Sequence, residues 1–479
     1  MNFRANAAQE TVRLAPFSGV QFLVYGFNAD RVARFTPRAF IEHPQVERTS
    51  ADGKTPIELR PGWNDLDAEA PPPFTPKGRD RGYDISAQRA LEPFLGKWIP
   101  APFLAIEANV DSHGHQLLQQ GPTNWARVRV SLAEPGNEEG LTHRVVFAID
   151  TEILERRPNR AYVAPSPQDA QGEQEFCFAY LFRDIAWFLS DMRRGPGGGE
   201  EVNRQEWVER WVDELFVESK TAQKGRPPRD DEREGPLEHA ARYIAFLQYL
   251  YHAMAIPRLR LIDTLSDDPS VRPVDVDLVL DIGASRSCGL LIESFPNQEK
   301  IDLGNSFVLQ LRDLEEPHRV YDDPFESDVQ LATAEFGKEH LSRWSTRTRA
   351  FFWPSLVRIG PEAARYRESA EGTEGASGMS SPKRYLCSVE PVNQEWRFQP
   401  RDYGARGQPP TIDLAARNYL NFRGDVLRQV AEERRFYERL VWMPDFAELD
   451  QPATRLSYSR SSFFTFMVME ILYQAFTLV

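Results

Sequence analysis

Seven residues between two apolar runs have the types and the spacing expected of a phosphate-binding turn. The stretch VDLVLDIGASRSCGLLIE (276–293) places Asp281 at the end of the first run, followed by a turn of small residues. An acidic residue at a strand end can hold Mg²⁺ through the waters of the ion. The N–H groups of a tight turn form a concave anion site, and Gly283 lets the backbone approach a phosphate that a Cβ would keep away.

Side chains in the same turn could add to anion binding. Ser285 and Ser287 supply hydroxyl donors, and Arg286 supplies positive charge. The alternative is an ordinary β-turn between two buried strands, because Asp-x-Gly is common in such turns and short glycine patterns recur by chance. The turn alone leaves both interpretations open.

Four segments in the second half of the chain, in this order, resemble the ATPases of the actin and heat-shock-chaperone class. They are DIGASRSCGLLI (281–292), RTRAFFWPSLVRIGPEA (347–363), SSPKRYLC (380–387) and YSRSSFFTFMVMEILYQAF (458–476). The first resembles the first phosphate motif of that class, the third its lysine-containing segment, and the last its long helix before the next sheet strand. The resemblance implies a ribonuclease H-like fold that uses ATP and Mg²⁺.

The resemblance also implies a role for each matching residue. Asp281 would face Mg²⁺, and Lys383 would hold the γ-phosphate and orient the attacking water, a role that suits a compact point charge. The β- and γ-phosphates would contact Gly283 and the amides of Ala284, Ser285 and Arg286. Chaperones usually carry a hydroxyl residue where this chain has Ala284, so hydrolysis is expected to be slow or lost.

Half of such a site has no counterpart in the sequence. A complete site needs a second phosphate loop, an acidic residue from a connecting segment and a glycine pair for adenosine. The later candidate DYGARG (402–407) has no apolar strand before it and is interpreted as a loop. We therefore expect this chain by itself neither to bind ATP tightly nor to hydrolyse it.

The same segments, together with GKWIPAPF (96–103) and GPTNWARVRV (121–130), resemble the SrfB family of bacterial virulence factors over most of the chain. This resemblance implies a longer protein, in which the actin-like part continues beyond Val479. The apolar segment 463–479 contains Glu470 and Gln474 and is shorter than the ~20 apolar residues of a membrane span. A buried amphipathic helix, and not a span, is expected there.

Composition limits the class of protein. The 479 residues are 41% hydrophobic and carry a net charge of −14, which argues against a nucleic-acid backbone as the main partner. The three cysteines are far apart and lack C-x-x-C spacing, so they predict neither a disulfide framework nor a zinc site. The N-terminal residues lack the apolar core of a secretory signal, and a cytoplasmic location is expected.

We predict an α/β protein, in which an N-terminal α+β module (1–272) precedes the first half of an actin-like ATPase domain (273–479). Hydrophobic patterns in the module predict strands in 19–27 and 143–153 and helices in 178–192, 204–219 and 237–254. In the second part they predict an antiparallel meander over 277–314, a strand in 349–360, a flexible excursion over 361–382 and a helix in 418–442.

Other groupings of reactive residues have simpler explanations. Asp111, His113 and His115 alternate as metal ligands can, but the sequence offers no well-placed further ligand, so a solvated loop is expected. Cys288 has no histidine near it in sequence and is expected to pack in the core. One strand face, with Trp125, Arg127 and Arg129, could stack on a base, but packing or protein contact is expected on an acidic protein.

The leading hypothesis is an ATP- and Mg²⁺-dependent conformational switch that acts on protein partners, among which products of the same operon are candidates. Nucleotide would close the cleft, and the N-terminal module would transmit that state. The alternative is a non-catalytic scaffold with a degenerate nucleotide site, which Ala284 permits. A third class is a cysteine or metal hydrolase.

Overall fold

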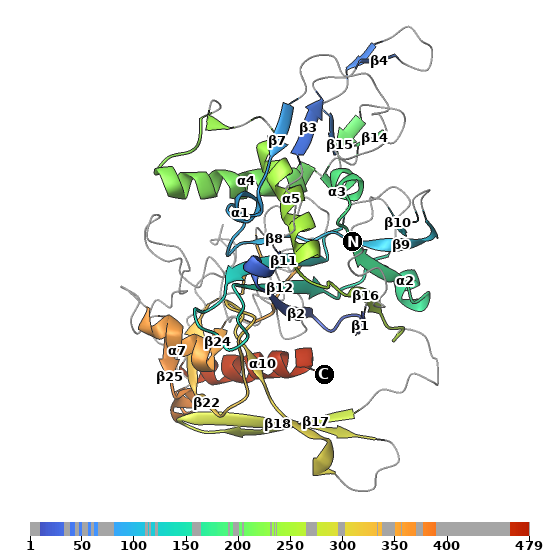
Figure 1. Ribbon diagram of the computed structural model, residues 1–479. Coiled ribbons are helices and arrows are strands. Elements are labelled where there is room, and N and C mark those ends of the chain that lie inside the picture. Colours follow the sequence, from blue (N-terminus) through green and yellow to red (C-terminus); the bar gives the residue numbers. More distant parts are fainter. Residues whose placement is uncertain are drawn as a thin grey trace, which may run out of the picture. The chain divides into compact units, whose positions relative to one another are not determined.

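The computed structural model contains two compact units (Figure 1). The first comprises 1–271 and 336–351, and the second comprises 272–335 and 352–479. The chain combines helices with several β-sheets and is therefore a mixed α/β protein. The structure describes residues 10–32, 39–43, 47–49, 56–58, 62–65, 81–110, 114, 116–119, 123–155, 164–189, 192–194, 201–203, 206–229, 232–233, 235, 237–264, 275–295, 302–332, 334–337, 350–355, 357–369, 377–388 and 460–478.

Two sheets form the framework of the first unit. The larger has the order β1-β16-β13-β9-β10, in which β1 and β16 are parallel and the other neighbours antiparallel. Its strands are β1 (Thr11–Leu14), β9 (Phe103–Val110), β10 (Gln116–Leu118), β13 (Glu175–Phe178) and β16 (Arg258–Leu261). The other sheet is antiparallel and has the order β2-β12-β11-β8. Its strands are β2 (Val20–Phe27), β8 (Trp98–Pro100), β11 (Ala126–Leu132) and β12 (His143–Asp150).

Shorter elements complete the first unit. Three small antiparallel groups, β6-β3-β7, β4-β5 and β14-β15, consist of β3 (Ala39–His43), β4 (Glu47–Thr49), β5 (Pro56–Glu58), β6 (Gly62–Asp65), β7 (Arg81–Asp84), β14 (Met192–Arg194) and β15 (Glu201–Asn203). The helices are η1 (Ala29–Val32), α1 (Ala87–Leu91), α2 (Pro167–Gln171), α3 (Phe182–Leu189), α4 (Glu206–Lys224) and α5 (Glu238–Ala253). Helix α5 is buried from Glu238 to Leu250, which is typical of a helix that is apolar around most of its circumference.

The segment 336–351 follows β23 of the second unit but belongs to the first. Arg127, on β11, is 2% exposed, and its guanidinium carbon lies 3.9 Å from the ring centroid of Phe351 and 4.7 Å from that of Trp211. The same guanidinium donates to the carbonyl of Phe336. The carboxylate of Asp150, on β12, accepts the N–H of Phe351 at 2.7 Å. We call Arg127, Asp150 and Trp211 the Arg127 socket.

The shape of the socket constrains the segment that it holds. Gly337 has φ +103°, and a Cβ at this position would overlap the ring of Trp211. Only glycine combines this backbone conformation with such a close approach. Both described ends of the segment are thus fixed in the first unit.

Three groups of strands form the second unit. The first has the antiparallel order β17-β18-β19, and β22 also pairs with β18. The second has the antiparallel order β24-β23-β25, and β20 pairs with β21. The strands are β17 (Asp275–Ile282), β18 (Arg286–Ser294), β19 (Ser306–Val308), β20 (Leu311–Arg312), β21 (Val320–Tyr321), β22 (Phe325–Glu326), β23 (Asp328–Leu331), β24 (Val357–Ile359) and β25 (Gly378–Ser380). The helices are η3 (Leu303–Asn305), α7 (Gly360–Glu368), η4 (Pro382–Tyr385) and α10 (Arg460–Leu478).

Helix α10 supplies one side of the core of the second unit, and Figure 1 shows it beside the β17–β18 hairpin. Its buried apolar residues recur at every fourth position, as on one face of a helix: Phe463, Met467, Ile471 and Ala475. They pack with strand residues Leu291, Leu309, Leu311, Phe325, Val329, Leu331, Val357 and Ile359. The alternate residues of β17, from Val276 to Ile282, lie against the same core.

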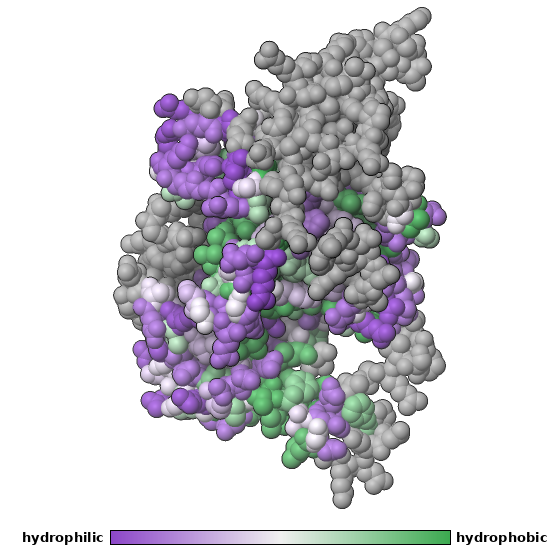
Figure 2. Space-filling model, viewed as in Figure 1, coloured by the Kyte–Doolittle hydropathy of each residue, from purple (hydrophilic) through white to green (hydrophobic). Residues whose placement is uncertain are grey.

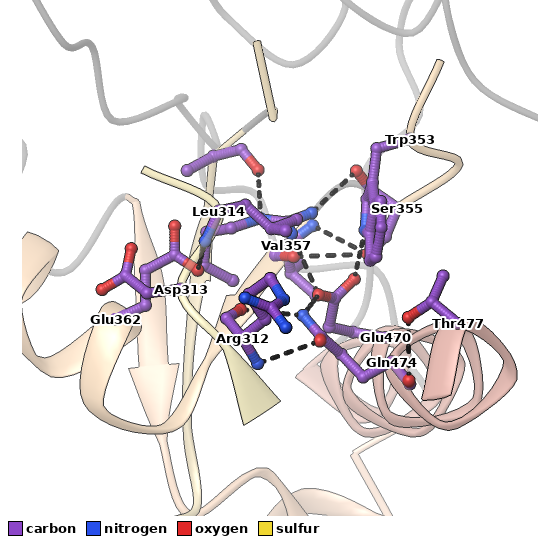
Figure 3. Close-up of polar contacts among 12 residues, drawn as sticks. Arg312, Asp313, Leu314, Trp353, Ser355, Val357, Glu362, Glu470, Gln474 and Thr477 are labelled. Atoms are coloured by element: carbon purple, nitrogen blue, oxygen red, sulfur yellow. Dashed lines mark hydrogen bonds and ion pairs between the residues drawn. The ribbon is translucent and has the colours of Figure 1, made fainter. Parts of the chain in front are cut away.

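A buried ion pair connects α10 to β24 (Figure 3). Nη1 of Arg358 lies 2.9 Å from Oε1 of Glu470, and the two side chains are 0% and 1% exposed. The carboxylate of Glu470 also accepts Nε1–H of Trp353 and Nε2–H of Gln474, each at 3.0 Å. Gln474 in turn bonds to both backbone groups of Arg312 at 3.1 Å, so the charges lie in a connected polar network.

Arg358 also joins two chain segments that are distant in sequence. Its Nε–H donates to the carbonyl of Ala332 at 3.2 Å, and Nη2–H donates to that of Ser355 at 3.3 Å. Ala332 follows β23 and Ser355 precedes β24. The guanidinium therefore holds together the segments that leave for 336–351 and return from it.

Several predicted elements agree with the structure. The strands predicted in 19–27 and 143–153 are β2 and β12, and the three helices predicted in the N-terminal module are α3, α4 and α5. The antiparallel meander from 277 onwards begins with β17, β18 and β19. The helix predicted in 418–442 and the loop in 402–407 lie outside the described residues.

Three predictions in the second unit were wrong in part. The predicted flexible excursion 361–382 begins with α7 and includes β25, because Pro361 starts the helix and its Ala363 and Tyr366 are buried. The predicted strand 349–360 is limited to β24, since Phe351 adopts φ +56° and precedes a proline-containing segment. The last strand of the meander, 306–314, is divided between β19 and β20.

Among the described residues, α10 is the one helix long and apolar enough to cross a membrane, judged by length and composition alone. In this structure its polar Glu470 and Gln474 are 1% and 3% exposed and are bonded within the second unit.

The ion pair of α10 predicts a large and partner-dependent effect on stability. Arg358→Met should lower the free energy of unfolding of the second unit by about 3–5 kcal/mol, because it leaves Glu470 buried without a counter-charge. The double variant Arg358→Met/Glu470→Met should recover most of that loss. Urea denaturation measures both, and Arg319→Met, at a half-exposed pair with Glu316, is the control with an expected loss below about 1 kcal/mol. An additive double variant would contradict the coupling.

Candidate functional site at the β17–β18 turn

The turn 283–285 joins β17 to β18 and has a closed backbone conformation. The N–H of Gly283 donates to the carbonyl of Arg286 at 3.0 Å. A Cβ on Gly283 would overlap that carbonyl oxygen, so glycine is required for the close approach. The predicted reason for Gly283 was access for a phosphate, and the structure adds the closure of the turn itself.

Ser327 holds the turn from the opposite side. Its Oγ–H donates to the carbonyl of Gly283 at 2.9 Å, and its N–H donates to the carbonyl of Ser285 at 2.9 Å. The same Oγ lies 3.0 Å from Oγ of Ser287. Ser287 and Ser327 are each 2% exposed, so their hydroxyls stabilise the turn from inside.

The structure brings Lys383 to the same turn, although the two are distant in sequence. Nζ of Lys383 donates to the carbonyl of Ile282, the last residue of β17, at 2.6 Å. Helix η4 is positioned by Ser381, whose N–H donates to the carbonyl of Ser327 at 2.7 Å. The backbone of Ser381 has φ +55°, a left-handed conformation that turns the chain from β25 into η4. An exposed ammonium group thus lies at the end of β17.

The tip of the turn has donors that the hairpin does not use. Within the described part of the chain, the N–H groups of Ala284 and Ser285 donate to no acceptor, whereas that of Gly283 is used by the turn. Arg286 is exposed, and its guanidinium lies 3.9 Å from the carboxylate of Glu326. Successive free amides beside a lysine are the donors of an anion-binding concavity.

Asp281 lies on the solvent-facing side of the hairpin. It pairs across the strands with Cys288, and the exposed positions of β17 alternate with half-buried ones. On the same face, Leu290 pairs with Val279 on one side and with Val308 on the other. The exposed fractions of Val279, Leu290 and Val308 are 53%, 38% and 44%. Figure 2 shows apolar side chains in green at the lower edge of the molecule, where β17 and β18 lie. The carboxylate is therefore accessible.

The predicted site residues thus fall into two groups. Gly283, Ala284, Ser285 and Lys383 surround one end of β17, and Asp281 and Arg286 are exposed beside them. Ser287 belongs to the buried side of the turn, where its hydroxyl bonds to Ser327. No cluster of three or more His, Cys, Asp or Glu in the described parts of the chain could hold a metal ion by itself.

The sequence analysis missed Ser327 and Ser381. Ser327 lies in a polar stretch, FESDVQL, that carries no motif, and its role depends on β22 and β23 meeting the hairpin. Ser381 was quoted within SSPKRYLC, but nothing in its type indicates the positive φ that it adopts. Long-range pairing, which the sequence does not display, positions both residues.

Asp328, next to Ser327, has an unusual environment for a carboxylate. Burial raises the pKa of Asp328, and the ion pair with Arg367 opposes this effect. The side chain is 6% exposed while that of Arg367 is 49% exposed. Ionisation of this carboxyl group beside the site therefore costs desolvation.

The other groupings of reactive residues take no part in this site. Trp125 and Arg127 are 0% and 2% exposed, so they cannot stack on a base. Cys288 is a half-buried free thiol. The metal hypothesis for Asp111, His113 and His115 lies outside the described residues.

The contacts of Ser327 predict a loss of stability on its removal. Ser327→Ala should lower the free energy of unfolding by about 1–3 kcal/mol, because the part-buried carbonyl of Gly283 loses its donor and the buried hydroxyl of Ser287 loses its partner. The control is Ser306→Ala, which also removes one serine bond, from Oγ to the carbonyl of Leu303, at a more exposed position. Urea denaturation compares the two, and equal losses would contradict the role given to Ser327.

The environment of Asp328 predicts a pH dependence. Because its folded pKa lies above the ~3.9 of an unfolded aspartate, the stabilising contribution of the carboxyl group is present below that pH and is lost as the pH rises through the folded pKa. Asp328→Asn stays neutral, so its free energy of unfolding relative to the natural protein should increase as the pH rises above about 4. Denaturation at a series of pH values measures the difference, and a decrease with pH would contradict the assignment.

Comparison with known proteins gives the family but no structural precedent. No curated protein and no solved structure matches the chain. One family model does, described as virulence factor SrfB, and its match extends over residues 4–479. The chain therefore belongs to the SrfB family of virulence factors.

Proposed function

We propose that this member of the SrfB family is an ATP- and Mg²⁺-dependent conformational switch, of the actin and heat-shock-chaperone type, that acts on protein partners. The observation that carries the proposal is the position of Lys383, whose Nζ lies 2.6 Å from the carbonyl of Ile282 at the start of the turn. The two residues are 101 positions apart, so the fold, and not local sequence, places an ammonium group beside a turn with free amides.

The donors at the turn suit a terminal phosphate. The ammonium of Lys383 would contact the γ-phosphate as a point charge. The amides of Ala284 and Ser285 would donate to oxygens of the β- and γ-phosphates. Asp281, exposed and close in sequence to the turn, would hold Mg²⁺ through water. When bound, Mg²⁺ would neutralise part of the negative charge of the phosphates.

A scaffold with a degenerate nucleotide site is the second candidate function, and Ala284 favours it. The position lacks the hydroxyl group that the chaperone class usually has there. Binding without turnover is then expected. Such a protein would keep the fold and the partner surface, and it would lack a hydrolytic cycle.

Binding of Mg·ATP to the full-length protein, measured by calorimetry, tests the switch. Lys383→Ala should weaken binding at least about ten-fold, which equals about 1.4 kcal/mol, because a charge-assisted bond to phosphate is lost. Arg384→Ala is the matched control, since it removes the neighbouring exposed charge of η4. Equal effects of the two variants, or no binding to the natural protein, would contradict the proposal.

Asp281 is tested by the dependence of that binding on Mg²⁺. Asp281→Asn should reduce the gain in ATP affinity that Mg²⁺ gives, because the variant loses the charge that holds the hydrated ion. Asp275→Asn, an exposed aspartate on the same strand and face, should leave that gain unchanged. Titrations with and without Mg²⁺ separate the two, and an unchanged gain in Asp281→Asn would overturn the role.

A further inference from the structure

Strand β17 lies at the edge of its sheet, and its outer side has no partner in the described part of the chain. It pairs with β18 alone, over its whole length from Asp275 to Ile282. An edge strand presents a row of unpaired N–H and C=O groups, which can bind a further strand. An edge of eight residues is long, because proteins commonly protect their sheets by keeping edge strands short.

The register of the hairpin identifies the backbone groups that point away from β18. Hydrogen-bonded and non-hydrogen-bonded pairs alternate in an antiparallel ladder, and Gly283 donates to the carbonyl of Arg286 across the turn. The odd-numbered residues of β17 therefore bond to β18, and the even-numbered ones direct their N–H and C=O groups outwards. We call Val276, Leu278 and Leu280 the free edge, because their backbone groups have no acceptor or donor among the described residues.

One end of this row of backbone groups is closed. The carbonyl of Ile282 points outwards like those of the free edge, and Nζ of Lys383 donates to it at 2.6 Å. A strand that docks on β17 is therefore limited to the residues before Ile282. Docking there leaves the contact of Lys383 with the β17–β18 turn intact.

The inner face of the free edge is incompletely covered. Val276, Leu278 and Leu280 are half-buried against the core of the second unit. By contrast, Leu291, which pairs with Leu278 from β18, is 2% exposed. A further strand beside β17 would remove more apolar surface from water, and we expect the residues of that strand that face the core to be apolar.

The outer face of the same strand is acidic. Asp275, Asp277 and Asp281 are exposed on it, and Val279 lies between the last two. None of the three aspartates forms an ion pair within the part of the chain that the structure describes. Opposite charges on neighbouring strands stabilise their pairing, so we expect the outward residues of a docked strand to be lysine or arginine.

A second copy of this chain does not fit the free edge. If two β17 strands pair antiparallel about Leu278, Asp275 of each copy lies opposite Asp281 of the other. Pairing about Asp277 or Val279 likewise places Asp277 opposite an aspartate of the other copy. Like charges directly opposite each other destabilise a strand pair, so the aspartates disfavour self-association through this edge.

We propose that the free edge of β17 binds an extended segment of a protein partner in which apolar and basic residues alternate. Main-chain hydrogen bonds to the free edge provide affinity, as in other cases of strand addition. The aspartates of the outer face select the charge of the segment. The docking surface lies on the second unit and needs no nucleotide, so it is independent of the proposed function.

A fluorescent peptide of alternating lysine and valine, about ten residues long, tests the surface in the full-length protein without nucleotide. Fluorescence anisotropy should show binding, and a peptide of alternating glutamate and valine should bind at least about ten-fold more weakly. Asp275→Lys/Asp277→Lys should abolish this preference. The control Asp322→Lys/Asp323→Lys makes the same change in net charge at exposed positions outside the strands and should retain the preference.

Leu278→Pro tests the backbone of the free edge. Proline lacks an N–H group and is tolerated on edge strands where that group faces away from the sheet, so the ladder with β18 is kept. The affinity for the basic peptide should fall at least about ten-fold. If this variant does not fold, hydrogen exchange of the natural protein replaces it. The peptide should slow exchange at the amides of Val276, Leu278 and Leu280 at least about five-fold, and it should leave Asp277 and Val279, which β18 protects, unchanged.

Three results would overturn the proposal. The first is no binding of the basic peptide, and the second is an equal loss of preference in the two charge-reversed proteins. The third is slow exchange at the free edge before any peptide is added, since another part of the chain or a second copy then covers it. Failure of ATP to bind would contradict the proposed function and would leave the peptide experiment unaffected.

Discussion

The ion pair between Arg358 and Glu470 is the constraint on which the second unit depends. Two opposite charges with exposed fractions of 0% and 1% remain favourable only while every remaining donor and acceptor is used. Trp353, Gln474 and the carbonyls of Ala332 and Ser355 supply these partners. The network therefore fixes the register of α10 against β24 in a way that an apolar stripe, which tolerates small shifts, would not.

The turn at Gly283 depends on the same register through the strands between them. Arg358 pairs with Gln330 in the centre of β23, and the residue before β23 is Ser327, which holds the turn. Strand β25, on the other edge of β23, leads into the helix that carries Lys383. Strand β23 thus positions both Ser327 and Lys383, although neither residue lies on it. A change in that strand would move both together.

The sequence predicted local patterns well and long-range placement poorly. The element types were predictable where they follow from local burial. More exposed and less exposed residues alternate along β17 and β18, and apolar residues recur every three or four positions in α3, α4, α5 and α10.

The insertion of 336–351 into the first unit could not be predicted, because Arg127 looks like an exposed strand residue until Phe336 and Phe351 cover it. The helix in 361–382 was obscured by the glycine-rich residues that follow it. In the site, the glycine turn was readable, while Ser327 became visible only through pairing.

A switch at this turn does not need a hydrolytic step. A ligand shifts an equilibrium between two conformations by its difference in affinity for them, and free amides with one lysine can provide such a difference. Hydrolysis demands more, since metal, water and phosphate must all be positioned. Ala284 lacks a hydroxyl, and the hydroxyl of Ser287 is bonded inside the turn to Ser327, so neither residue offers one to an attacking water. In a nucleotide switch of the proposed kind, this turn would therefore respond to binding and not to turnover.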